Sequence, residues 1–214
     1  MAISFKGAHF PKDVILFAVF FYLRYDVSYR DLEEIMAERG VTIDHATLNR
    51  LVIRYAALVT EMARHRKGYT DRSWRMDETY IRVKRQWVYL YRAVDKFGQT
   101  IDFMLSKKRD KAAATKFSAW ALAANGLPRK IAINRMLKRF GCPIAIEMVR
   151  IKYLNNIIEQ DHCFIKRRTR PMLGFKSFAA ASSTIAGIEI VNMIRKGQFM
   201  PELRPFQQFC QLAA

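Results

Sequence analysis

The chain has 214 residues, enough for one large domain or for a catalytic domain with a small module. Hydrophobic residues make up 51% of the sequence, which excludes a globally disordered protein. The formal net charge of +18 favours a polyanionic partner, most simply nucleic acid. Nearly all of this charge lies in residues 71–214. Residues 1–70 have a net charge of +2, whereas residues 71–130 and 131–214 have +8 each.

Cysteine usage and hydropathy exclude further classes. The three cysteines are widely spaced and none forms a C-x-x-C pair, so the sequence indicates neither a zinc site nor a disulfide framework, and a cytoplasmic setting fits. The most apolar run, Val14–Leu23, is too short to span a bilayer and is interpreted as a buried helix, so no membrane span is expected.

Three helices are predicted before residue 65. The first covers about Asp13–Tyr25. Ser28 is a candidate N-cap for the second, with Asp31 in a capping-box arrangement, and Gly40 follows the end of that helix near Glu38.

Asp44 is expected to cap the third helix, from His45 to about Ala63. Two helices joined by a short Gly-containing turn resemble a helix-turn-helix, in which the start of the last helix enters the major groove. An ordinary three-helix bundle is the alternative. The side chains predicted to contact DNA are His45, Thr47, Asn49, Arg50 and Arg54.

A polar break at residues 65–71 precedes three strand-like runs, which predict an antiparallel meander. The runs are Trp74–Lys84, Gln86–Asp95 and Thr100–Ser106. An Ala-rich helix, Lys111–Ala124, and a short strand, Arg129–Ile133, follow, which is the order expected of an α/β fold with a mixed sheet.

Two more helices are predicted, Asn155–Arg168 and Ser177–Lys196, and the tail from Pro201 carries no clear signal. On the first of them Glu159, His162, Cys163 and Lys166 share one face, followed by Arg167 and Arg168. An ordinary intrahelical ion pair would also account for an acid and a cation at this spacing.

Two adjacent acids, Asp77 and Glu78, stand near the start of the first strand. Neighbours in a strand point to opposite faces, so the two carboxylates are expected to serve different purposes.

Several long stretches, in order, resemble the short bacterial insertion-sequence transposases of the DDE, or RNase-H-like integrase, superfamily, of the cointegrate-forming type. They include S-Y-R-D-L-E-E-I-M-A-E-R-G-V-T-I-D-H, M-D-E-T-Y-I-R-V, W-V-Y-L-Y-R-A-V-D, I-K-Y-L-N-N-I-I-E-Q-D-H and L-G-F-K-S-F. The resemblance implies an RNase-H-like mixed sheet with flanking helices, preceded by a helix-turn-helix module. It places the DNA-binding module at residues 1–67, the catalytic core at 72–170 and a C-terminal helix and tail at 171–214.

The resemblance also implies roles. Asp77 corresponds to the first catalytic, metal-binding carboxylate and Glu159 to the last, while Lys166, with Arg167 and Arg168 after it, is expected to contact DNA. The implied cofactor is Mg²⁺ or Mn²⁺, because paired divalent ions held by carboxylates support phosphodiester cleavage and strand transfer. The implied partners are double-stranded DNA, both element ends and target, and further copies of the chain, near the bacterial nucleoid.

The middle carboxylate of the family is missing. No Asp or Glu occurs between Asp110 and Glu147, and Ile133-Asn134 resembles the scar of an internal deletion of about a dozen residues in a core shortened near 133–134. Asp95 and Asp102 remain open as replacements, and metal binding is expected to be weakened.

The sequence therefore predicts a transposase that is catalytically defective in this copy, which leaves its activity as an enzyme open. The alternative is a non-catalytic DNA-binding protein that occupies element ends or inhibits a full-length transposase. A basic RNA-binding or membrane-surface protein is a third reading, supported by charge alone.

Overall fold

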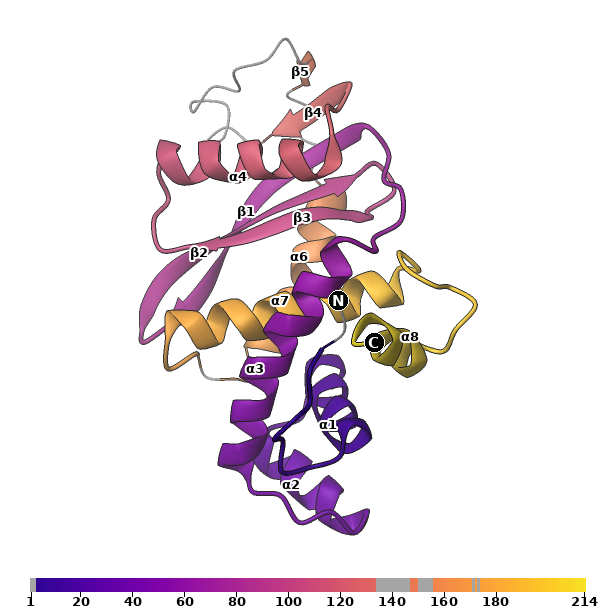
Figure 1. Ribbon diagram of the computed structural model, residues 1–214. Coiled ribbons are helices and arrows are strands. Elements are labelled where there is room, and N and C mark those ends of the chain that lie inside the picture. The colour runs from indigo at the N-terminus through magenta and orange to yellow at the C-terminus, as the bar shows by residue number, and fades with distance from the viewer. Residues whose placement is uncertain (1–2, 134–146, 150–155, 171, 173) are drawn as a thin grey trace. The chain divides into compact units, whose positions relative to one another are not determined.

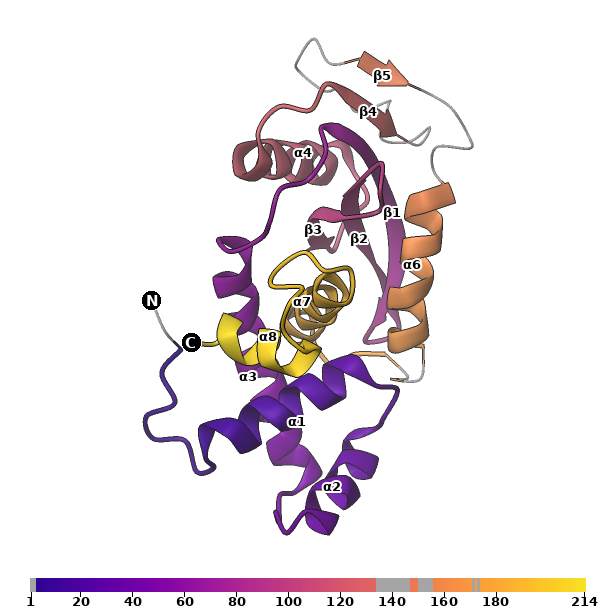
Figure 2. The ribbon, with the colours of Figure 1, turned by 90° about the vertical axis from the view of Figure 1, so that its right-hand side faces the viewer.

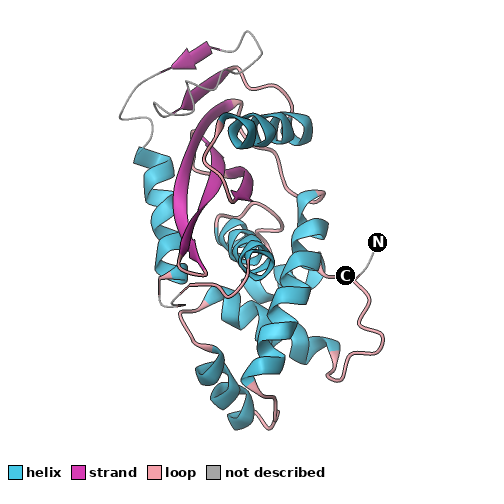
Figure 3. Cartoon of the chain, turned by 90° about the vertical axis from the view of Figure 1, so that its left-hand side faces the viewer, coloured by secondary structure: helices cyan, strands magenta, loops and turns pink. Residues whose placement is uncertain are grey.

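The computed structural model of the protein describes residues 3–133, 147–149, 156–170, 172 and 174–214. The chain forms two compact units, one from residues 1–68 and 167–214 and the other from residues 69–166. All described strands belong to the second unit (Figure 3). Among the described helices, none is long and apolar enough to cross a membrane.

The second unit is built on a five-stranded sheet of order β3-β2-β1-β4-β5. Strands β1 (Ser73–Val83), β2 (Gln86–Asp95) and β3 (Thr100–Ser106) pair antiparallel, as the predicted meander requires. Strands β4 (Lys130–Ile133) and β5 (Glu147–Val149) are parallel to β1 and to β4 respectively. This mixed sheet and its flanking helices confirm the predicted fold class.

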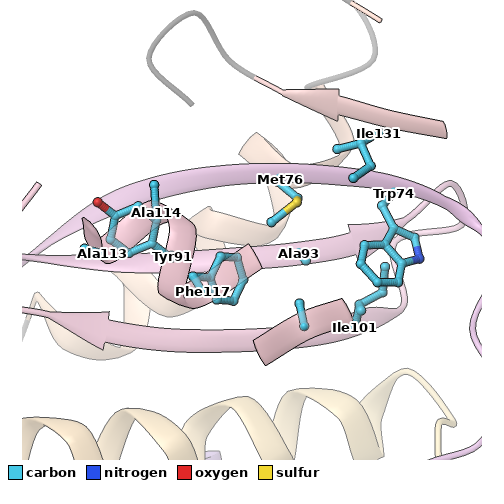
Figure 4. Close-up of a cluster of buried hydrophobic side chains, with 10 residues drawn as sticks. Trp74, Met76, Tyr91, Ala93, Ile101, Ala113, Ala114, Phe117 and Ile131 are labelled. Carbon is cyan, nitrogen blue, oxygen red and sulfur yellow. The ribbon is translucent and has the colours of Figure 1, made fainter. Parts of the chain in front are cut away.

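Helix α4 (Lys111–Asn125) covers one face of the sheet because its apolar stripe matches the apolar side of β1 and β2. Asp110 caps it through the amide of Ala113. Figure 4 shows the resulting core. Its buried members are Trp74, Met76, Tyr91, Ala93, Ile101, Ala113, Ala114, Phe117, Ala121 and Ile131.

Helix α6 (Asn156–Thr169) lies beside β1 on the other side of the sheet from α4 (Figure 2). Ile158, His162 and Ile165 are its buried side chains within this unit, at the spacing of one helical face. The sheet is therefore covered on both faces, and polar side chains of β1 and β2 face α6.

The first unit contains α1 (Lys12–Arg24), α2 (Tyr29–Glu38) and α3 (His45–Arg64), which confirms the three predicted helices to within a residue or two (Figure 1). Ser28 and Asp31 form both bonds of the predicted capping box. Whether α2 and α3 act as a helix-turn-helix stays a prediction.

Helices α7 (Phe178–Arg195) and α8 (Pro205–Leu212) belong to the same unit and pack on α1 and α3. Phe20 of α1 contacts Phe206 and Phe209 of α8, with ring centroids 5.4 Å apart in both pairs. The sequence predicts a separate C-terminal helix and tail at residues 171–214, whereas these contacts make α7 and α8 part of the same helical unit as α1 and α3.

Gly187 of α7 marks the closest approach among α1, α3 and α7. A Cβ atom at this position would lie 2.7 Å from Leu23 Cδ1 and 2.8 Å from the Cβ of Ala56. We expect Gly187→Ala to lower the free energy of unfolding by about 1–3 kcal/mol through overpacking, although Gly→Ala usually stabilises a helix. Thermal unfolding followed by circular dichroism measures this, and a raised Tm would contradict the close packing.

Candidate active site

Asp77 and Glu78 point to opposite faces of β1. Trp74 and Met76 pack against α4, so Glu78, two residues beyond Met76, shares the α4 side, and Asp77 points to the side of α6. Across the antiparallel pair, Asp77 lies opposite Arg92 of β2 and Glu78 opposite Tyr91. The expectation that the two acids serve different purposes agrees with this geometry.

Glu78 belongs to a buried structural pair. It accepts a hydrogen bond from Arg109 Nε at 3.0 Å and is only 8% exposed. Burial raises the pKa of the neighbouring Tyr91 to about 12, and the charge of Glu78 adds to this shift, so Tyr91 stays neutral at physiological pH. Glu78 therefore has a basic partner, Arg109, on the α4 side of the sheet.

Asp77 meets α6 through His162. The distance from His162 Nε2 to Asp77 Oδ2 is 3.4 Å, and the Asp77 side chain is 15% exposed whereas that of His162 is 5% exposed. The Asp77 carboxylate therefore lies at the edge of the core, partly open to solvent.

A second contact between the sheet and α6 is an ion pair. The Arg92 guanidinium has no exposed surface and donates a hydrogen bond of 2.5 Å to Asp161 Oδ2. Since Arg92 lies directly opposite Asp77 in the sheet, the two contacts fix α6 against the pair of strands that carries the candidate catalytic acid.

Glu159 is exposed and lies three residues before His162 on α6. Residues three apart on a helix are neighbours, with Cβ atoms about 5–6 Å apart. Glu159 therefore belongs to the turn of α6 next to the one that contacts Asp77. The structure places α6, which carries Glu159, on the same side of β1 as Asp77.

Strand β4 ends beside Asp77. Its last residue, Ile133, pairs with Met76, the residue that precedes Asp77 on β1. A carboxylate placed directly after β4 would thus stand next to Asp77 in the sheet. The residue at that place in the sequence is Asn134, which lies outside the described residues together with the rest of the predicted deletion site.

The DDE domain family matches residues 71–198, more than half of the chain. The transposase for insertion sequence-like element IS431mec of Staphylococcus aureus is 40% identical over 205 positions, which take in 90% of this chain and 88% of the relative. The chain belongs to the DDE transposases of insertion sequences. The transposase of IS257 in transposon Tn4003, also from Staphylococcus aureus, has the same identity and coverage.

In the alignment with the IS431mec relative, some positions of the relative have no counterpart in the present chain. The alignment runs over 205 positions but takes in only 90% of 214 residues, or about 193, so about a dozen positions have no residue in this chain.

Among solved structures, the HTLV-2 integrase catalytic core domain in complex with magnesium has a TM-score of 0.38 and 15% identity, covering 69% of this chain and 86% of that one.

Neither acid left open as a replacement ligand faces Asp77. Asp102 lies opposite Ala93 on the α4 side of the sheet. Asp95 is 1% exposed, and its carboxylate accepts hydrogen bonds from the amides of Asp71, Phe97 and Gln99, all at 2.9 Å. Asp95 therefore organises the β2–β3 turn, and both alternatives fail for geometric reasons.

The donor set of this transposase fits only part of a divalent metal site. Asp77 and Glu159 offer hard oxygen ligands of the kind Mg²⁺ prefers. Within the described parts of the chain, however, no group of three or more His, Cys, Asp or Glu side chains could hold a metal ion.

The predicted DNA-contacting residues of α3 differ in how strongly they are engaged. His45 donates its amide to Glu33 at 3.1 Å, and its ring Nδ1 lies 2.9 Å from the same carboxylate oxygen. Thr47 and Asn49 are half-buried and bonded within the unit, to Asp44 and Tyr29 respectively.

Arg50 and Arg54 are exposed on α3. The Arg50 guanidinium donates a 2.8 Å bond to Thr47, and that of Arg54 lies 5.3 Å from the centre of the Tyr55 ring. These two cations are the members of the predicted set that remain best placed for a partner.

The prediction that Arg168 contacts DNA is corrected by its burial in the structure. It is 3% exposed and donates hydrogen bonds to Asp26 and to the backbone carbonyl of Tyr22. Burial lowers its pKa, an effect that Asp26 partly offsets. The i, i+3 spacing from Ile165 turns Arg168 inward, so it stabilises the helical unit, whereas Arg167 is exposed and Lys166 half-buried.

The sequence did not reveal that Arg92, Asp161 and His162 join β1 and β2 to α6 beside Asp77. Asp161 lies two residues after Glu159 and so on a different face of α6, and this offset turns it toward Arg92. The available signal was a single charged residue, Arg92, inside the apolar run Val88–Val94.

Proposed function

We propose that the chain is a transposase by descent that binds the ends of its insertion sequence and lacks one of the three carboxylates needed for DNA cleavage and strand transfer. The observation that carries this proposal is the convergence of Asp77 and the α6 turn of Glu159 on one side of β1, beside the end of β4.

Asp77 and Glu159 would hold the divalent metal ions. Such ions, Mg²⁺ or Mn²⁺, supply an activated hydroxyl nucleophile and stabilise the leaving oxygen of the phosphodiester. His162 and the Arg92–Asp161 pair orient Asp77 and α6 from the protein side. With two of three acids present, we infer that binding is weak and that catalysis is lost.

The gaps in the alignment support a deletion as the cause. About a dozen positions of the IS431mec relative have no counterpart in this chain, and residues 111–146 contain no acid at all. A loss placed directly after Ile133 would remove the carboxylate that belongs next to Asp77.

Double-stranded DNA is the proposed partner, with Arg50 and Arg54 of α3 reading the element ends. Lys166 and Arg167, which follow His162 on α6, would contact phosphates of the DNA backbone. The net charge of +18 supports such a partner, and we propose a homo-oligomer because two element ends must be held together.

Binding to the inverted repeats that flank the coding sequence tests this function. We expect Arg50→Ala to weaken binding to these ends by about five- to a hundredfold but to weaken binding to random DNA much less. Fluorescence anisotropy at several salt concentrations measures both. Lys6→Ala, which removes the same charge from an exposed site outside α3, is the control. Equal losses for ends and random DNA would contradict reading by α3.

The second candidate function is end occupancy without any catalysis, in which the chain inhibits an active transposase of the same element. The incomplete carboxylate set favours it. Adding the chain to a strand-transfer reaction of such a transposase tests this inhibitory role, since an occupant of the ends would reduce the yield in proportion to the fraction of ends bound.

A further inference from the structure

The outer end of the β1–β2 hairpin leaves large aromatic side chains in solvent. Tyr80 is 46% exposed and Trp87 is 60% exposed, while Tyr89 is half-buried. Tyr80 pairs with Tyr89 across the hairpin, and Arg82 pairs with Trp87, so all four side chains lie on the α4 side of the sheet. We call Tyr80, Arg82, Trp87 and Tyr89 the hairpin patch.

The rings of the hairpin patch form a continuous row. The Tyr80 centroid lies 6.2 Å from that of Trp87 and 5.7 Å from that of Tyr89, with edge-to-face geometry in both pairs. Tyr89 packs against the edge of the α4 core, whereas Tyr80 and Trp87 are not part of it, so the row extends from that core into solvent.

The opposite face of the same hairpin segment is fully buried. Ile81, Val83, Val88 and Leu90 are all at most 5% exposed. The hairpin is therefore held by its other face, and the exposed rings are not required to anchor it.

Positive charge surrounds the hairpin patch. Residues 79–91 contain three cations, Arg82, Lys84 and Arg85, all exposed, and no acid. At the tip, Lys84 and Arg85 both have positive φ angles, 48° and 64°, in a two-residue turn for which Asn-Gly is the favoured sequence. Arg109 lies 5.6 Å from the centre of the Tyr80 ring and neutralises Glu78, the nearest acid along β1.

We propose that the hairpin patch binds unpaired nucleotides of a DNA strand. Bases would stack on Trp87 and Tyr80, and phosphates would lie against Arg82, Lys84 and Arg85. Every base offers a flat π-face to such a platform once it is unstacked, whereas bases inside a duplex are already stacked. A second copy of the chain fits less well, because it would bring two like-charged surfaces together.

The choice of DNA as the ligand rests on the proposed function, but the binding itself involves neither Asp77 nor Glu159 nor the sequence of the element ends. A transposase that failed to recognise its ends would still bind single strands here. Conversely, loss of this binding would leave recognition of the ends by α3 untouched.

Anisotropy with a labelled oligothymidylate of about a dozen nucleotides, compared with a random duplex of the same length, tests the proposal on the full chain. We expect Trp87→Ala to weaken single-strand binding by about five- to a hundredfold and duplex binding by less than about twofold. Trp87→Phe should retain most of the affinity, because it keeps a ring. Phe97→Ala, which removes an exposed ring at the β2–β3 turn, should change nothing.

Three results would overturn the proposal. One is unchanged single-strand affinity in both Trp87→Ala and Tyr80→Ala. Another is an equal loss for single strand and duplex, which would reduce the patch to a phosphate contact. The third is a change of oligomeric state in Trp87→Ala, measured by light scattering, while its DNA binding stays unchanged. This result would make the hairpin patch a contact between copies of the chain.

Discussion

Replacing Asp161 with leucine is expected to lower the free energy of unfolding of the unit at residues 69–166 by about 3–5 kcal/mol. The Arg92 guanidinium has no exposed surface and bonds to Asp161 at 2.5 Å. Removing the carboxylate withdraws the counter-charge of a buried cation, which costs far more than the loss of a surface pair.

Urea unfolding followed by tryptophan fluorescence measures this effect on the correct unit, because Trp74, Trp87 and Trp120 all lie within residues 69–166. Gln160→Leu, at an exposed neighbouring position of α6, provides the same added apolar surface without loss of the pair. The double variant Arg92→Met with Asp161→Leu should recover much of the loss, since it removes both buried charges. An Asp161→Leu variant as stable as Gln160→Leu would show that α6 is not held by this pair.

Restoring the segment after Ile133 is expected to create strand-transfer activity. The change inserts about a dozen residues after Ile133, the number of positions of the IS431mec relative that have no counterpart in this chain, and the first inserted residue is an Asp. Because β4 ends beside Asp77, the added carboxylate would complete a set of three metal-binding acids. Loss of any one of three such acids is expected to lower the reaction rate by orders of magnitude.

The restored variant has two decisive controls. Asp77→Ala and Glu159→Ala, each introduced into it, should abolish the new activity, while Asp102→Ala should not, since Asp102 lies on the α4 side of the sheet. Activity that survives Asp77→Ala would show that the metal ligands lie elsewhere. Gel analysis of joined products on DNA carrying the element ends gives the yield.

Much of the fold could be predicted because its signals are local. Ser28, Asp31 and Asp44 form the capping bonds expected from their spacing, and those bonds define where α2 and α3 begin. The meander followed from alternation and from turn residues such as Gly98, whose φ is 81°.

The remainder depended on contacts between distant segments. Helix α8 is short, and its aromatic side chains become informative only once Phe20 lies against them. The buried position of Arg168 follows from Asp26 and Tyr22, which are far away in the sequence. A run of three basic residues could not reveal that its last member turns inward.

In the candidate site, too, some residues are predictable from local sequence signals and others only from contacts between distant segments. The residue types and the family resemblance predict Asp77 and Glu159, rather than Glu78, as the catalytic acids, and this assignment stays a prediction. The roles of Arg92 and Asp161 required the register that places Arg92 opposite Asp77 and the turn of α6 that faces it. The exclusion of Asp95 and Asp102 likewise required the sheet.

Strand transfer by the wild-type chain, on DNA that carries its element ends and with Mg²⁺ or Mn²⁺ supplied, tests the central claim most directly. With Asp77 and Glu159 present and the middle carboxylate absent, we predict binding of the ends and no joined product. Efficient product formation that is abolished by Asp77→Ala would contradict the claim, since it would mean that the site is complete as it stands.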